Sequence, residues 1–95
     1  MSDTLKRLEI LYELKKYEEL LHVSVPLCTS SSKSESKAYM YTILALIALK
    51  RYHEAVVYCQ NALASFPHII YFLYLNALIN YHQKAYKEAL SLIKN

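Results

Sequence analysis

Few residues of this chain could bind a metal ion or carry out nucleophilic chemistry, and they are scattered. Zinc sites usually take ligand pairs at the spacings C-x₂₋₄-C or H-x₃₋₅-H, and no two histidines or cysteines here have either spacing. We therefore expect no metal site. Cys59 is expected to be a small core residue, at helical spacing from Ala55 and Ala62. The residues considered as metal ligands are His22, His53, His68, His82, Cys28 and Cys59.

The serines and carboxylates also lack a catalytic arrangement. Nucleophilic catalysis needs a serine or cysteine held beside a base, but the serines cluster mainly in the polar segment 29–36. The acidic residues Glu18, Glu19, Glu54 and Glu88 stand near expected helix starts, where negative charge complements the helix dipole. This pattern predicts that the protein is not an enzyme.

Glycine is absent from all 95 residues. Phosphate loops, dinucleotide fingerprints and nucleophile elbows need glycine where the backbone takes positive φ or approaches a ligand. Tight primed β-turns depend on glycine as well. We therefore expect an all-α chain with no cofactor and no small-molecule substrate.

Composition and charge predict a soluble protein without a nucleic-acid or membrane partner. Hydrophobic residues make up 55% of the chain, and 11 basic and 8 acidic residues give a net charge of +3. No dense run of Lys and Arg is present, and the longest apolar stretch, 69–81, is shorter than the ~20 residues of a membrane span. Two isolated cysteines and the lack of a signal peptide favour an intracellular location, in the cytoplasm or nucleus.

A short motif occurs three times in the sequence. Residues 50–56 (KRYHEAV) return as residues 84–90 (KAYKEAL), a spacing of 34 positions (84 − 50), and residues 15–21 (KKYEELL) form an earlier copy. Each copy follows one helical pattern and begins another, so we expect six helices in three hairpins. Breaks are predicted before Pro26, at Lys50–Arg51 and near Gln83–Lys84.

This pattern resembles the tetratricopeptide repeat (TPR), a 34-residue helix-turn-helix. The resemblance implies hairpins stacked as a right-handed superhelix in one domain, 1–95. It divides into a degenerate first pair (1–28), a Ser-rich linker (29–36), a second repeat (36–69) and an incomplete third repeat (70–95). The linker is either a phosphorylation site or a spacer. The residues that the resemblance assigns to packing within and between repeats are Tyr17, Tyr39, Tyr52, Ala55, Ala62, Pro67, Ala77, Tyr86 and Ala89.

Departures from the TPR pattern are Ile43 at a small-residue position, Lys50 and Lys84 where a turn glycine is common, and Leu20 and Pro26 in the first copy. The first helix of each pair would line a concave groove. The groove residues implied are Met40, Tyr41, Leu44, Ile47 and Ala48, with Tyr74, Leu75, Leu78, Tyr81 and His82.

This apolar groove predicts a non-catalytic scaffold that binds an amphipathic helix. The chain is similar to the N-terminal repeat region of scaffold subunits of the anaphase-promoting complex, a ubiquitin ligase of the cell cycle, and this resemblance implies a homodimer. Four alternatives stay open: a TPR adaptor or co-chaperone with a hetero partner peptide, an RNA-binding repeat, a small enzyme, and a face covered by the chain's own neighbouring helix. The groove lacks Lys and Arg, which disfavours clamping of a carboxylate or binding of RNA.

Overall fold

The computed structural model describes residues 2–29 and 36–94, with the backbone alone described at residues 2, 89 and 91–94. These residues are helical apart from short turns, and the predicted all-α class is confirmed. The five helices are α1 (Ser2–Glu13), α2 (Tyr17–Thr29), α3 (Ser36–Ala48), α4 (Tyr52–Ser65) and α5 (Ile70–Lys94). Most of the predicted Ser-rich linker falls at residues 30–35, outside the described ranges.

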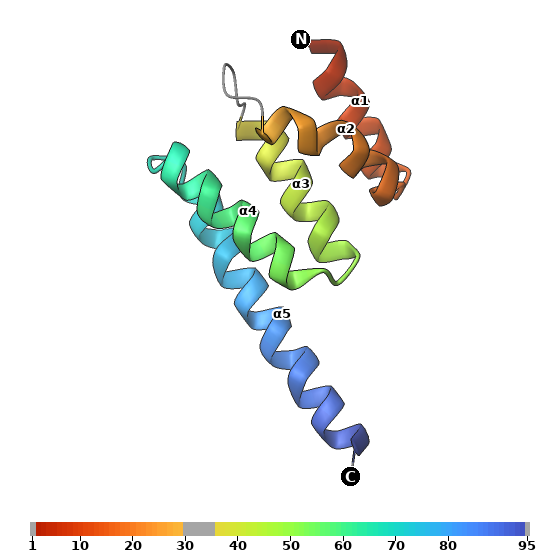
Figure 1. The fold of residues 1–95 in the computed structure, drawn as a ribbon, viewed down its shortest axis with the longest axis vertical. Coiled ribbons are helices and arrows are strands. Elements are labelled where there is room, and N and C mark those ends of the chain that lie inside the picture. Colours follow the sequence, from red (N-terminus) through yellow and green to blue (C-terminus); the bar gives the residue numbers. More distant parts are fainter. Residues whose placement is uncertain (1, 30–35, 95) are drawn as a thin grey trace.

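Each helix packs on the helix that follows it, and α3 also contacts α1 and α5. In Figure 1, α4 lies across the first half of α5, whereas the second half of α5 extends beyond the other four helices. The molecule is therefore elongated, with extents of 50 × 29 × 18 Å.

Two lysines make the turns between α1 and α2 and between α3 and α4. Lys15 and Lys50 have φ of 60° and 62°, in the left-handed region that glycine usually occupies. In each turn the lysine N–H donates to the carbonyl three residues back, and the next N–H donates to the carbonyl five residues back, with N···O distances of 2.8–3.0 Å. This is the Schellman pattern, so the repeated motif forms the same turn twice without glycine.

The third copy of the motif does not form a turn. The helix α5 runs without a break from Ile70 to Lys94, so the predicted break near Gln83–Lys84, the sixth helix and the third hairpin are wrong. A left-handed lysine costs about 1–2 kcal/mol, and packing of the following helix offsets this cost. After Lys15 the following helix, α2, packs on α3, and after Lys50 the following helix, α4, packs on α5. Beyond Lys84 the described chain has no later helix to pack on, and the straight helix keeps its backbone hydrogen bonds.

The predicted end of the second helix before Pro26 is also wrong. Pro26 lies inside α2, which continues to Thr29. The missing proline N–H removes one hydrogen bond close to the end of the helix, where this loss matters least. The Thr29 hydroxyl donates to the Pro26 carbonyl at 3.2 Å, so this carbonyl is hydrogen-bonded at the end of the helix.

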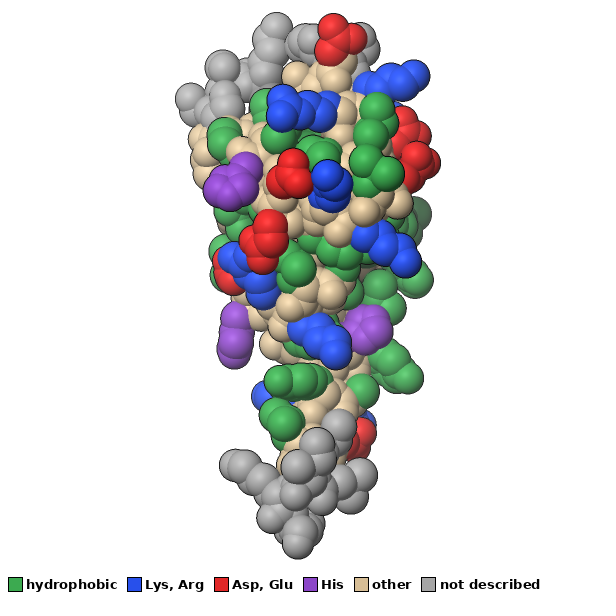
Figure 2. Space-filling model, turned by 90° about the vertical axis from the view of Figure 1, so that its right-hand side faces the viewer, with side chains coloured by type: hydrophobic (Ala, Val, Ile, Leu, Met, Phe, Trp, Pro, Cys, Tyr) green, Lys and Arg blue, Asp and Glu red, His purple; other side chains and the backbone are tan. Residues whose placement is uncertain are grey.

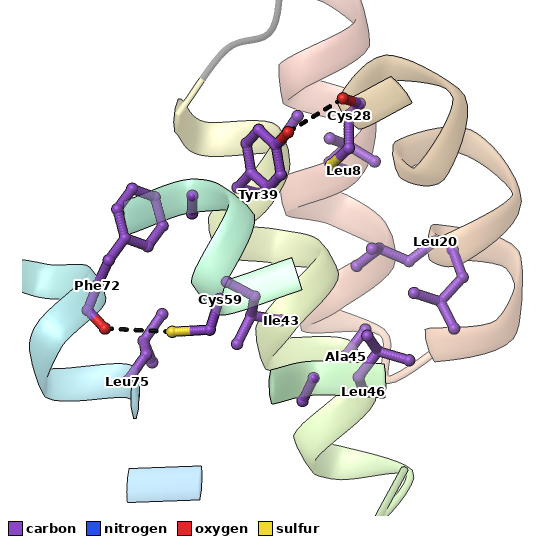
Figure 3. Packing of buried hydrophobic residues seen from close by; sticks show 14 of the residues in the cluster. Leu8, Leu20, Cys28, Tyr39, Ile43, Ala45, Leu46, Cys59, Phe72 and Leu75 are labelled. Carbon is purple, nitrogen blue, oxygen red and sulfur yellow. Dashed lines mark hydrogen bonds between the residues drawn. The ribbon is translucent and has the colours of Figure 1, made fainter. Parts of the chain in front are cut away.

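The core is built on both sides of α4. Its buried side chains are small: Ala55, Cys59 and Ala62 are fully buried, which lets α3 and α5 approach α4 closely. The Cys59 thiol donates to the Phe72 carbonyl at 3.3 Å and ties α4 to α5 (Figure 3). The larger buried side chains come from the other helices: Leu8, Leu20, Ile43, Leu46, Phe72, Leu75 and Ile79.

A buried polar cluster joins α2 to α3. The Thr42 hydroxyl lies 2.7 Å from the Ser24 hydroxyl and 2.7 Å from the Ala38 carbonyl oxygen, and it also contacts the Cys28 thiol at 3.4 Å. The Tyr39 hydroxyl donates to the Cys28 carbonyl at 3.2 Å (Figure 3). Because these groups satisfy one another away from water, the cluster fixes how α2 sits on α3.

We predict that Lys50→Gly stabilises the protein, because glycine removes the strain of the left-handed turn. Glycine also adds entropy to the unfolded chain, which offsets part of this effect. The free energy of unfolding should therefore rise by roughly 0.5–1 kcal/mol, and Tm by about 2–6 °C. Thermal melting followed by circular dichroism measures it. Lys84→Gly is the matched control and should lower Tm, because it places glycine inside α5. The same sign for both variants would contradict this account of the turns.

Replacing Thr42 by valine should destabilise the fold by about 1–3 kcal/mol, because the buried Ser24 hydroxyl loses a partner. Urea denaturation of Thr42→Val, Ser24→Ala and the double variant measures the coupling. The double variant should recover part of the loss, since it leaves no unpaired hydroxyl. Strictly additive losses would show that the two hydroxyls do not act together.

Candidate protein-binding surface

In the described residues the two thiols are buried and three of the four histidines are exposed. Cys28 and Cys59 are buried and unpaired with each other. Burial raises the pKa of both thiols, and the hydrogen bond with Thr42 offsets this only in part at Cys28. His22, His53 and His68 are exposed on different helices or turns. No three His, Cys, Asp or Glu side chains of the described chain lie together as metal ligands would.

The largest of the described cavities lies between α2 and α4 and has a volume of about 340 Å³. Arg51 forms its charged wall. The guanidinium donates to both oxygens of Glu54 at 2.8 and 2.7 Å and reaches Glu18 at 3.5 Å. The hydrogen bonds from Arg51 lower the pKa of Glu54, so this carboxylate stays ionised at neutral pH. In this exposed cluster Arg51 pairs with two carboxylates, and its contact with Glu18 joins the start of α4 to α2.

The opposite side of α3 carries a continuous half-exposed face. Met40, Tyr41, Leu44 and Ile47 are partly exposed along it and Ala48 is exposed, so this half of the predicted groove set shares one face. A hollow of about 270 Å³ lies between α1 and α3, and one of about 250 Å³ lies between α3 and α5. We call this face, with its two hollows, the α3 groove.

Lys37 lines both hollows of the α3 groove. The expectation that the groove lacks Lys and Arg is therefore wrong at this end, where Lys6 of α1 also lines the hollow between α1 and α3. The signal was available, because Lys37 precedes Met40 and Tyr41 by three and four residues and so lies on the same helical face. The hollow between α3 and α5 is otherwise mainly apolar, with Met40, Ile69, Tyr71, Phe72 and Ser36 in its lining.

The predicted groove residues of α5 do not share one face. Leu75 is fully buried in the core, so its assignment to the groove is wrong. Leu78 and His82 are half-buried, and the His82 ring stacks on Tyr52 of α4 at 5.9 Å between centroids. Tyr74 and Tyr81 are exposed on another face. A repeat pattern gives the period of a helix but not which neighbouring helices cover each of its sides. The prediction therefore placed buried, half-buried and exposed residues of α5 in one groove.

The residues predicted to pack within and between the repeats also differ in burial. Tyr39, Ala55 and Ala62 are buried as expected. Tyr17 and Tyr52, at equivalent positions of α2 and α4, are half-buried in aromatic groups: Tyr17 contacts Tyr12, and Tyr52 contacts His82 and Tyr86. Pro67, Ala77 and Tyr86 are exposed, contrary to expectation, and the side chain of Ala89 is outside the description.

The most exposed apolar side chains concentrate on α5. Ile70, Leu73, Tyr74 and Tyr81 are 77%, 55%, 57% and 68% exposed, a feature that the sequence analysis did not single out as a surface. On the flank shown in Figure 2, by contrast, acidic, basic and hydrophobic side chains are interspersed, and no large region of one charge forms. No helix in the described ranges has the length and hydropathy needed to cross a bilayer.

Comparisons of this chain with protein-family models, curated proteins and solved structures found no significant match. The described side chains form two apolar surfaces, the α3 groove and the outward side of α5.

We predict that both cysteines react slowly in the folded protein. Burial excludes the reagent, and the raised pKa values delay thiolate formation to more alkaline pH than for a free cysteine. Reaction with Ellman's reagent should be at least a hundredfold slower in native buffer than in denaturant. Fast reaction of one thiol under native conditions would show that its helix opens locally.

Proposed function

We propose that the protein is a non-catalytic scaffold that binds an amphipathic helix of another protein in the α3 groove. The observation that carries this proposal is the pair of hollows on the same side of α3, joined through Lys37. A helix laid across α3 at Lys37, from α1 towards α5, would place side chains in both hollows, which is the helix-in-groove mode of recognition.

A TPR-like arrangement of the helices is part of this proposal. Three observations support it: the repeated sequence motif, the identical lysine turns at Lys15 and Lys50, and the contacts of α3 with both α1 and α5. In such an arrangement the first helices of successive pairs stand in a row and form one binding face. The resemblance to scaffold subunits of the anaphase-promoting complex stays a prediction that no comparison supports.

The lining of the groove defines the chemistry of the partner helix. Met40 and Tyr71 favour an apolar contact face on that helix, and Lys37 and Lys6 favour an acidic residue beside it. Glu9, in the hollow between α1 and α3, disfavours a second acidic residue there. The partner we propose is therefore a helix with an apolar stripe and a single acidic flank near its contact with Lys37.

We expect the folded protein to bind a designed, fluorescein-labelled peptide helix that has leucines on one face and glutamate on one flank. Fluorescence anisotropy measures the binding, and a scrambled peptide of the same composition is the control. Met40→Asp should weaken binding at least tenfold, about 1.4 kcal/mol, because the new carboxylate loses water in an apolar hollow. Helical content by circular dichroism should stay nearly unchanged.

Two further variants sharpen this test. Val57→Asp is the matched control, because Val57 is 54% exposed on α4 and lies outside the groove, so binding should not change. Lys37→Glu should weaken binding of the glutamate peptide and strengthen binding of a lysine version. Equal binding of the scrambled peptide, or no effect of Met40→Asp, would contradict the proposed function.

A further inference from the structure

A second apolar surface runs along the outward side of α5. We define the outer stripe as Ile70, Leu73, Tyr74, Ala77 and Tyr81, which recur at helical spacing and are all exposed. The core side of the same helix holds Phe72, Leu75 and Ile79. The first half of α5 is therefore apolar on two opposite sides, and only one of them is covered by described residues of this chain.

The straight course of α5 explains why the outer stripe is uncovered. In the predicted third hairpin, the segment after Lys84 would fold back as an antiparallel helix and cover this half of α5, as α4 covers α3. Instead the segment continues along the helix axis, away from the stripe (Figure 1). At 1.5 Å per residue, α5 is about 37 Å long against about 21 Å for α4.

The exposed area is large enough for an interface between two copies. With about 200 Å² for a complete large side chain, the four large members of the stripe expose on the order of 500 Å². Two such stripes bury about 1,000 Å² in total, the lower bound for a specific protein interface, before flanking residues are counted. A patch of this size is also at the upper end of what monomers expose.

Charge points to a second copy as the occupant. Residues 70–83 contain no Asp, Glu, Lys or Arg, whereas the whole chain has a net charge of +3. Two identical cationic chains repel each other over most of their surfaces, and a neutral apolar stripe is where they meet at least electrostatic cost. Ala77, near the middle of the stripe, lets two helices approach closely where they cross.

We propose that the protein forms a two-fold dimer in which the α5 helices of two copies lie antiparallel along their outer stripes. With the symmetry axis at Ala77, Leu73 of each copy faces the partner's Tyr81, so the contact is the same in both directions. The α3 groove borders the stripe at Tyr71, whose ring stacks on the ring of Tyr74 at 5.8 Å between centroids, but neither hollow of the groove is used in this contact. This dimer therefore goes beyond the proposed function and does not depend on it.

Light scattering across a hundredfold range of concentration tests the dimer. The wild-type mass should rise from 11.1 kDa for one chain to twice that value as concentration increases. The variant Leu73→Ser/Tyr81→Ser should weaken the dimer at least tenfold and keep its helical content, because both side chains are exposed. Leu14→Ser is the matched control, since Leu14 is 59% exposed outside the stripe and its loss should leave the dimer intact.

Cysteine cross-linking tests the antiparallel register. Under mild oxidation, Ala77→Cys should form a disulfide dimer, because the two introduced thiols meet at the axis, whereas Asn61→Cys on α4 should not. Leu73→Cys mixed with Tyr81→Cys should cross-link to each other, and neither should cross-link alone. Self-cross-linking of each single variant would indicate a parallel pair and overturn the proposed register.

The remaining outcomes separate the two proposals. A mass of one chain at every concentration overturns the dimer. If the thiol of Ala77→Cys is also inaccessible to reagent in that monomer, the chain covers its own outer stripe. If Met40→Asp abolishes the dimer and Leu73→Ser/Tyr81→Ser does not, the two copies pair through the α3 groove. That result also overturns this inference. Loss of peptide binding with an intact stripe dimer would overturn the proposed function alone.

Discussion

The packing of small side chains on α4 is the constraint on which the rest of the structure depends. Ala55, Cys59 and Ala62 are fully buried, and they let α3 and α5 approach α4 from its two sides. Larger side chains there would force the helices apart and open cavities around Ile43 and Phe72. The close approach also brings the Cys59 thiol to the Phe72 carbonyl. Because α4 holds α3 and α5 in place, it positions both apolar surfaces without belonging to either.

The local features of the fold could be predicted from sequence because they depend on short-range physics. The repeated motif marked the lysine turns at Lys15 and Lys50. The break near Lys84 was predicted on the same grounds and is wrong. A similar motif forms a turn at Lys15 and Lys50 and lies inside a continuous helix at Lys84. The difference therefore lies in the surroundings of each copy and not in the motif itself.

The candidate site was predictable on α3 and not on α5, for a related reason. The helix α3 has core contacts on about half of its circumference, so one half-exposed face remains and periodicity identifies it. The first half of α5 is apolar on nearly every side, and periodicity cannot tell the buried Leu75 from the exposed Tyr74 beside it. Apolar periodicity does not identify Lys37, because Lys37 is the polar member of this face, about one turn before Met40 and Tyr41.

The order in which the helices pack also bears on how the chain folds. Since each helix rests mainly on its neighbour in sequence, most contacts close short loops and cost little chain entropy before they form. Helical proteins with such local topology fold in about microseconds to milliseconds. The two lysine hairpins are natural places for folding to begin. The far end of α5, which rests on no other described helix, gains order only from its own backbone hydrogen bonds and is expected to exchange its amide protons first.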